Sequence, residues 1–160
     1  MTAEMINAIE KPIENPIEQR NTGKGNPNAI LHYDVELNNR QKKILNRLPQ
    51  YDSRAIVSKK SVSMTDLAAL TAKTGDEFAM FTKGESRLII RGNSVKVNIN
   101  TEQAKELAEQ GYKWSGHTHP RVDFFCLEAS DGDLEIFQCF SQNSIVIYNS
   151  KGQYRKFEKE

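Results

Sequence analysis

The stretch "SGHTHP", Ser115–Pro120, holds two of the three histidines in the chain. On a β-strand, residues i and i+2 project from the same face, so His117 and His119 would point one way and Thr118 the other. Neutral imidazole is the commonest metal ligand in proteins, and zinc accepts it readily. The pattern therefore predicts part of a metal site at the end of a strand, because Pro120 cannot continue a central strand. In the alternative interpretation, one histidine is a satisfied core residue and the other is exposed.

A third ligand is available downstream in "SDGD", where Ser130 and Asp133 form an S-x-x-D pattern. This pattern is also typical of a helix N-terminus, in which Ser130 caps the helix and Asp133 complements the helix dipole. The two interpretations are compatible, since a carboxylate in the first turn of a helix is rigidly aimed. Asp131 and Asp123 are the competing candidates for this ligand.

A hydrolytic zinc site also needs a base for its water. Glu77 stands at the head of the apolar run "EFAMF" and is the one charge in it, so an acid placed there on a neighbouring strand would serve. The alternative is an ordinary glutamate at an exposed strand end.

A glutamate at the head of an early strand, then H-x-H-P, then S-x-x-D resembles the signature of the JAMM (JAB/MPN-type) zinc metalloproteases. The sequence around these motifs is most similar to that of a bacterial subgroup. In this subgroup, JAB-like domains form the C-terminal end of phage minor head proteins and polymorphic toxins. The resemblance covers Val62 to Phe157. The loop "RVDFFCLEA" between the two motifs is longer than is usual in the family, so we expect it to bulge outward.

The resemblance implies that His117, His119 and Asp133 bind Zn²⁺, that Glu77 is the general acid/base, and that Ser130 helps to stabilise the oxyanion. Glu85 is the fallback for Glu77. The activity implied is that of a peptidase or isopeptidase, in which a metal-activated water attacks a carbonyl carbon. Its substrate would be a protein or peptide, such as a ubiquitin-like tail or a phage or toxin protein.

Other zinc enzymes fit the sequence less well. A cytidine deaminase needs H-x-E and P-C-x-x-C, and the metallo-β-lactamase pattern H-x-H-x-D-H lacks its last histidine here. Two alternatives stay open: a non-catalytic JAB-like binding module, and a zinc-dependent toxin nuclease whose basic segment Arg40–Arg47 contacts nucleic acid. Phe124 and Phe125 are expected in the core, or else as one lip of a substrate groove.

Composition sets the broader limits. The 160 residues carry a formal net charge of +1, which gives no global argument for nucleic acid or an anionic membrane. No apolar run is long enough to span a bilayer and the N-terminus has no signal-type apolar segment, so we expect a cytoplasmic protein, or one carried in a virion or a larger parent. Cys126 and Cys139 are expected to be reduced, buried thiols.

The predicted fold is α/β (α+β), a single domain with a mixed central sheet flanked by helices, in the JAB/MPN-like layout. Residues 1–38 are predicted to be a flexible polar arm or linker, since three of the five prolines and no aromatic lie in 10–28. Residues 39–160 are predicted to form the zinc hydrolase domain, with its core in 62–157. The residue patterns predict helices within 38–50, 63–75, 102–110 and 131–140, and strands within 77–92, 94–100, 112–119 and 144–157, of which 77–92 and 144–157 are each expected to form a hairpin. Thr101 is predicted to cap its helix, and Trp114 to pack in the core on the face opposite the histidines.

Overall fold

The computed structural model describes residues 6–7, 36–120 and 129–159. Within these ranges the chain forms one α+β domain, in which six strands make a mixed sheet and the two-residue strand β1 (Ile6–Asn7) adds to one edge. The order across the sheet is β1-β7-β6-β5-β3-β4-β2, and the neighbours β5 and β6 are parallel while every other pair is antiparallel. The six longer strands are β2 (Arg54–Ser58), β3 (Phe78–Lys83), β4 (Ser86–Arg91), β5 (Lys113–His119), β6 (Ser144–Asn149) and β7 (Tyr154–Glu158).

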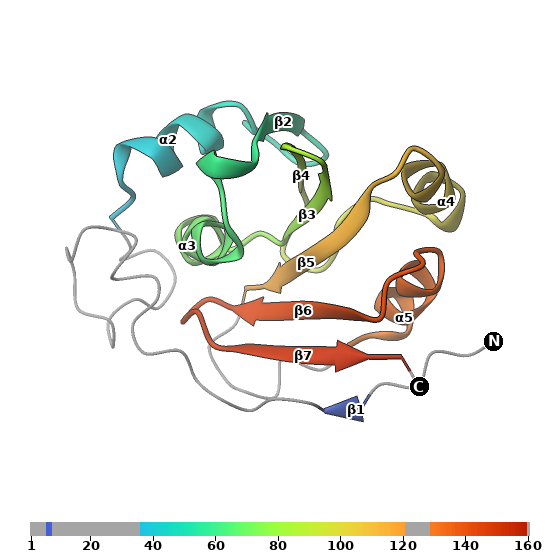
Figure 1. The fold of residues 1–160 in the computed structure, drawn as a ribbon. Coiled ribbons are helices and arrows are strands. Elements are labelled where there is room, and N and C mark those ends of the chain that lie inside the picture. The colour runs from blue at the N-terminus through green and yellow to red at the C-terminus, as the bar shows by residue number, and fades with distance from the viewer. Residues whose placement is uncertain (1–5, 8–35, 121–128, 160) are drawn as a thin grey trace.

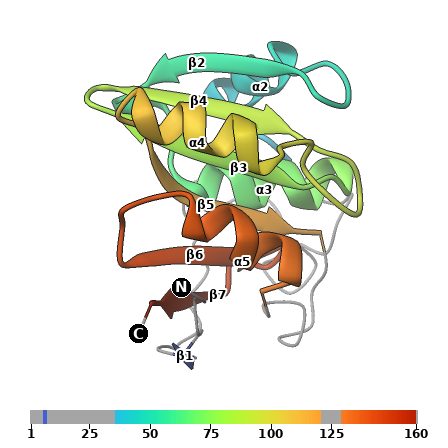
Figure 2. The same ribbon diagram turned by 90° about the vertical axis from the view of Figure 1, so that its right-hand side faces the viewer.

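Helices cover both faces of the sheet (Figures 1 and 2). One face carries α3 (Met64–Thr74), with α2 (Asn39–Asn46) packed against it, and the other carries α4 (Thr101–Glu109) and α5 (Asp131–Gln138). A short 3₁₀ turn, η3 (Lys59–Ser61), links β2 to α3. In the part of the chain that the structure describes, no helix combines the length and hydropathy needed to cross a bilayer.

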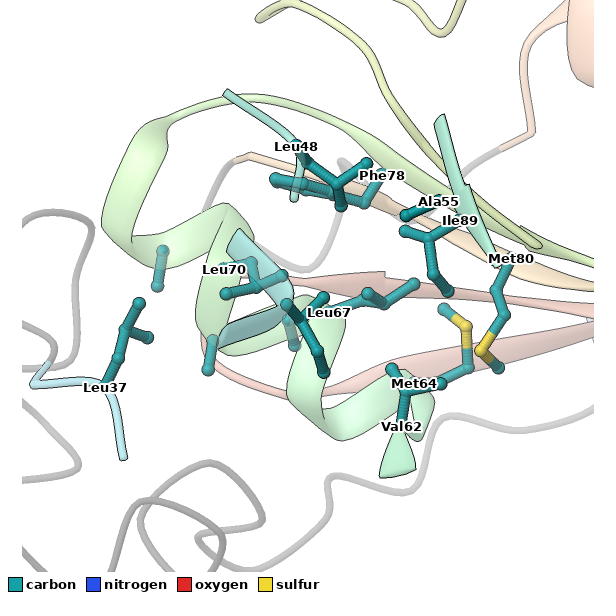
Figure 3. Packing of buried hydrophobic residues seen from close by; sticks show 14 residues of the cluster. Leu37, Leu48, Ala55, Val62, Met64, Leu67, Leu70, Phe78, Met80 and Ile89 are labelled. Atoms are coloured by element: carbon teal, nitrogen blue, oxygen red, sulfur yellow. The ribbon is translucent and has the colours of Figure 1, made fainter. Parts of the chain in front are cut away.

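Alternating side chains of the strands divide the core into two clusters. Figure 3 shows the cluster under α3, where Leu67 and Leu70 of the helix lie close to Phe78, Met80 and Ile89 of the sheet. The second cluster lies under α4 and α5 and contains the neighbours of those strand residues, such as Ala79, Phe81 and Ile90, with Phe137 from α5. The sheet is therefore buried on both faces, and any polar group at its centre must find a partner inside the protein.

Local signals predict most of the elements correctly. Ser63 and Asp66 form a reciprocal capping box at the start of α3, and Gly75 ends that helix in the left-handed conformation with φ of 77°. The hairpins of β3 with β4 and of β6 with β7 form as predicted. At α4 the cap is Asn100 and not Thr101, because the Asn100 side chain accepts from the backbone N–H of Gln103.

The strand predicted at 94–100 is wrong. The Asn93 side chain accepts hydrogen bonds from the backbone N–H groups of Val95 and Lys96, which folds the chain into a turn instead of a ladder. Val97 and Ile99 still pack inward against the cluster under α4 and α5, so the alternation in the sequence is real without a paired strand. The edge strand β2, whose residues pair with β4, is not predicted from the sequence.

Residues 8–35 of the predicted arm lie outside the described residues. Leu37 is buried in the cluster under α3, and Asn38 caps α2 with Gln41 in a second capping box.

The centre of β5 contains an irregularity that the sequence does not reveal. Met80 pairs with Gly116 and Phe81 pairs with Trp114, so Ser115 is an extra residue in β5, as in a β-bulge. The bulge brings Trp114 to the same face as His117, and the prediction that it lies opposite the histidines is wrong. Its predicted burial is confirmed, with 4% of its surface exposed.

Gly116 has no room for a side chain. A Cβ atom there would lie 2.5 Å from the backbone oxygen of Val146 and 2.8 Å from its Cγ2, and φ of 155° also disfavours other residues. The glycine before His117 therefore lets β5 approach β6 closely.

We expect Gly116→Ala to lower the free energy of unfolding by about 2–3 kcal/mol, because both the overlap and the backbone conformation are unfavourable. Gly84→Ala is the matched control: its φ of 57° is also positive, but nothing lies within 4 Å of the added Cβ. Urea unfolding of the two variants measures the difference. Equal losses at Gly84 and Gly116 would show that close packing against β6 is not what requires glycine here.

Candidate functional site

His117 and His119 lie at the end of β5, between β3 and β6. Their ring centroids are 4.8 Å apart, which confirms that the two imidazoles share one side of the strand. Thr118 points to the other face, where its hydroxyl contacts that of Thr71 and accepts from the backbone N–H of Phe78. This fully buried threonine anchors β5 to α3 and β3, and thereby fixes the direction of both histidines.

Glu77 immediately precedes β3 and reaches the same site. Its backbone N–H donates to Asn93 O, and its carbonyl accepts from Gly92 N–H, so the residue is held where the chain enters the sheet. The residue is only 7% exposed, and its Oε1 lies 3.5 Å from His117 Nδ1. The interpretation of Glu77 as an exposed strand-end residue is therefore wrong.

Asp133 reaches the same site from the first turn of helix α5. Ser130 caps this helix: its Oγ accepts from Asp133 N–H at 3.0 Å, while its own N–H donates to Asp133 Oδ2 at 2.9 Å. The reciprocal bonds fix the carboxylate so that Oδ1 lies 3.2 Å from His117 Nε2 and Oδ2 lies 3.6 Å from His119 Nε2. The longer loop before α5 is thus compatible with Asp133 reaching both histidines.

The remaining candidates do not join the cluster or cannot be placed. Glu85 is exposed in the β3–β4 turn, at the opposite end of β3 from Glu77. Asp131 is exposed in the first turn of α5, and no ion pair joins it to either histidine. The positions of Asp123, Phe124, Phe125 and Cys126 lie outside the described residues. Cys139 is free but only half-buried, so its predicted burial is not met.

The cluster has the donor set of a metal site. Among the described residues, Glu77, His117 and His119 each offer a ligand atom within 4.8 Å of the others. Asp133 supplies a further carboxylate in contact with both rings. Ligand atoms around a tetrahedral zinc ion with bonds of about 2.0–2.1 Å lie about 3.4 Å apart. The 3.2 and 3.6 Å contacts of Asp133 with the two Nε2 atoms are close to that spacing.

His117 Nε2 gives an independent indication. This atom is buried and has no hydrogen-bond partner among the described residues, since its contact with Asp133 lacks hydrogen-bond geometry. Its 3.2 Å contact with Asp133 Oδ1 is a contact between charges when His117 is protonated, and the hydrogen bond left unmade at this buried atom is costly. A cation between His117, His119 and Asp133 would satisfy it, so these residues fit a bound metal ion.

The charged neighbours of His117 determine whether its imidazole is protonated. Burial of the ring favours its neutral form, but Asp133 and Glu77 outweigh this effect and raise the pKa of His117 to about 10. Burial would also raise the pKa of Asp133, yet His117, His119 and the Ser130 backbone N–H hold it well below its usual range. Without a metal, His117 is therefore a buried cation that compensates the Asp133 carboxylate at neutral pH.

The cluster opens into a cavity of about 420 Å³. Glu77, His117, His119, Ser130 and Asp133 all line it, so the five residues that the family resemblance implies for the site reach one space. A volume of this size is sufficient for a small ligand or a short piece of peptide.

Sequence reasoning missed the apolar part of this cavity. Trp114 lines it and packs beside His117, with ring centroids 5.3 Å apart and the ring planes tilted by 30°, because the bulge at Ser115 turns the indole to this face. Val97 and Ile99 line it from the segment that was predicted to be a strand. Their inward alternation was a usable signal, whereas the bulge left no recognisable signal in the sequence.

Comparison with models of known protein families, with curated proteins and with solved structures finds no match to this chain.

The raised pKa of His117 predicts how the stability of the metal-free protein depends on pH. The contribution of protonated His117 to the free energy of unfolding should be fully present below the unfolded-state pKa of about 6.5. It should be lost as the pH rises through the folded-state pKa of about 10. At the acid end, the contribution of Asp133 is lost as the pH falls below about 4, because its pKa is lowered by folding. The stability advantage of wild type over His117→Gln should therefore be largest near pH 5–6 and should shrink towards pH 10.

Urea unfolding in the presence of a chelator, at steps from pH 5 to pH 10, measures this difference. A difference that stays constant across the range would contradict a protonated His117 in the metal-free cluster.

Proposed function

We propose that the chain is a zinc-dependent peptidase or isopeptidase of JAMM type, with the layout of a JAB/MPN-like domain. The observation that carries the proposal is the meeting of Glu77, His117, His119 and Asp133, from three separate elements, at one cavity. His117, His119 and Asp133 would hold the ion, and the contacts of Asp133 with the two Nε2 atoms, at 3.2 and 3.6 Å, support this choice because they are close to the spacing of zinc ligands.

Zinc at this position would supply Lewis-acid polarisation of the scissile carbonyl and would make the attacking water more acidic. Glu77 contacts His117 on the Nδ1 side of the ring, with Oε1 at 3.5 Å, and lines the same cavity as both histidines. Its carboxylate is therefore placed to accept a proton from the water that attacks the carbonyl carbon. As the carbon–nitrogen bond breaks, the same carboxyl group returns the proton to the leaving amine.

Ser130 would stabilise the charge that develops on the carbonyl oxygen. Its Oγ already accepts from Asp133 N–H, but a hydroxyl also has one proton to donate. Because Ser130 lines the cavity beside Asp133, this proton is available to an oxyanion bound there.

The family subgroup suggests a phage minor head protein or a polymorphic toxin as the parent of this domain. The substrate would then be a protein or peptide of that system, or a ubiquitin-like tail. A non-catalytic binding module would bind zinc without cleaving peptides, and a nuclease would cleave nucleic acid instead.

We expect the zinc-loaded protein to cleave members of an internally quenched peptide library. Glu77→Gln should lower the rate by a factor of about 10²–10⁴, because it removes the general base, while one zinc per chain is retained. Glu85→Gln is the matched control, since Glu85 is exposed at the other end of β3 and should leave the rate unchanged. Metal analysis and initial rates give both quantities for each variant.

An unchanged rate in Glu77→Gln would contradict the assignment of the base. Loss of zinc in that variant would instead make Glu77 a metal ligand, as part of the Glu77–His117–His119 group. Bound zinc without cleavage of any peptide would favour the binding module, and cleavage of nucleic acid would favour the nuclease.

A further inference from the structure

The cavity that contains the polar cluster also has an apolar wall. Val97, Ile99, Trp114 and Ile136 line it together with Glu77 and the two histidines. A ligand that reaches the histidines therefore also lies against apolar side chains, and its chemistry should match both parts.

Three separate parts of the fold build this wall. The turn held by the Asn93 side chain directs 95–99 across the cluster under α4 and α5. The bulge at Ser115 brings Trp114 beside His117, and the capped helix α5 contributes Ile136 as well as Asp133. The wall and the polar cluster are thus held by the same elements.

Part of the wall is open to solvent. Val97 and Ile99 are half-buried, in contrast to the fully buried residues beneath them, and Val95 at the same cavity is 75% exposed. Val95 is one of only three large hydrophobic residues that are strongly exposed in the described part of the chain. Covering this surface with an apolar group would be favourable, in proportion to the area removed from water.

We infer that the wall of Val97, Ile99, Trp114 and Ile136 receives an apolar side chain of the substrate, so that the site selects peptides with a large apolar residue at the attacked carbonyl. This inference rests on the proposed hydrolase function and specifies its substrate class. Trp114 and Ile99 are its main determinants, because Trp114 is adjacent to His117 and Ile99 belongs to the solvent-accessible segment.

Two zinc-binding probes that differ only in the side chain test the inference: the hydroxamates of N-acetyl-leucine and of N-acetyl-glycine. Trp114 is the only tryptophan in the chain, so tryptophan fluorescence of the zinc-loaded protein reports binding at this cavity alone. We expect the leucine compound to bind at least about tenfold more tightly, as burial of a leucine side chain predicts.

Ile99→Ser should reduce this preference to less than about threefold and leave the affinity for the glycine compound unchanged. Val97→Ser should act in the same direction, and thermal unfolding of both variants shows whether they are folded. Ile56→Ser is the matched control, because Ile56 is 53% exposed on the edge strand β2 and does not line the cavity. It should retain the full preference.

The outcomes separate the inference from the proposal on which it rests. Protein that takes up no zinc would overturn both. Zinc-loaded protein that binds the two hydroxamates equally, or that keeps its preference in folded Ile99→Ser and Val97→Ser, would overturn this inference alone. A leucine preference in protein that cleaves no peptide would support the apolar wall as a ligand site and count against hydrolysis.

Discussion

The structure depends on the burial of two carboxylates and two imidazoles at one end of a sheet that is covered on both faces. Glu77 and His117 are less than 10% exposed, and Asp133 lies against both histidines. Buried charges cost several kcal/mol each unless they are paired or bind a metal. In the metal-free protein a protonated His117 offsets part of the negative charge of the two carboxylates, and these carboxylates raise its pKa. A divalent cation would provide all of it, since the carboxylates would then face two neutral imidazoles and an ion of charge +2.

Much of the surrounding fold serves to hold these groups in place. Thr118 fixes the face of β5 from the opposite side, and Gly116 allows β5 to lie close to β6. Backbone hydrogen bonds to Gly92 and Asn93 hold Glu77 at the entry to β3, while the capping box of Ser130 aims Asp133. These four groups therefore come from three different parts of the fold and are positioned by hydrogen bonds and packing that are independent of any bound ion. Such a cluster is preorganised for ligand binding and does not have to form when the ligand arrives.

The sequence predicted the features that depend on local interactions. The capping boxes of α3 and α5, the two hairpins and the shared face of His117 and His119 all follow from residues a few positions apart. The features it did not predict depend on distant partners. The bulge at Ser115 is defined by pairing with Met80 and Phe81, which lie over thirty positions earlier in the chain. The segment at 94–100 alternates like a strand, but the Asn93 side chain competes successfully for its backbone N–H groups. The apolar wall of the cavity results from these two features together, and for that reason only the polar part of the site could be predicted.

We propose that one zinc ion binds between His117, His119 and Asp133, with Glu77 beside it and not bonded to it. Anomalous diffraction at the zinc edge, from crystals of the full chain grown with zinc, tests this directly. We expect a single strong anomalous peak about 2.0–2.2 Å from Nε2 of both histidines and from a carboxylate oxygen of Asp133. An empty cluster in such crystals, or a zinc ion bonded to Glu77 while Asp133 remains apart, would contradict it.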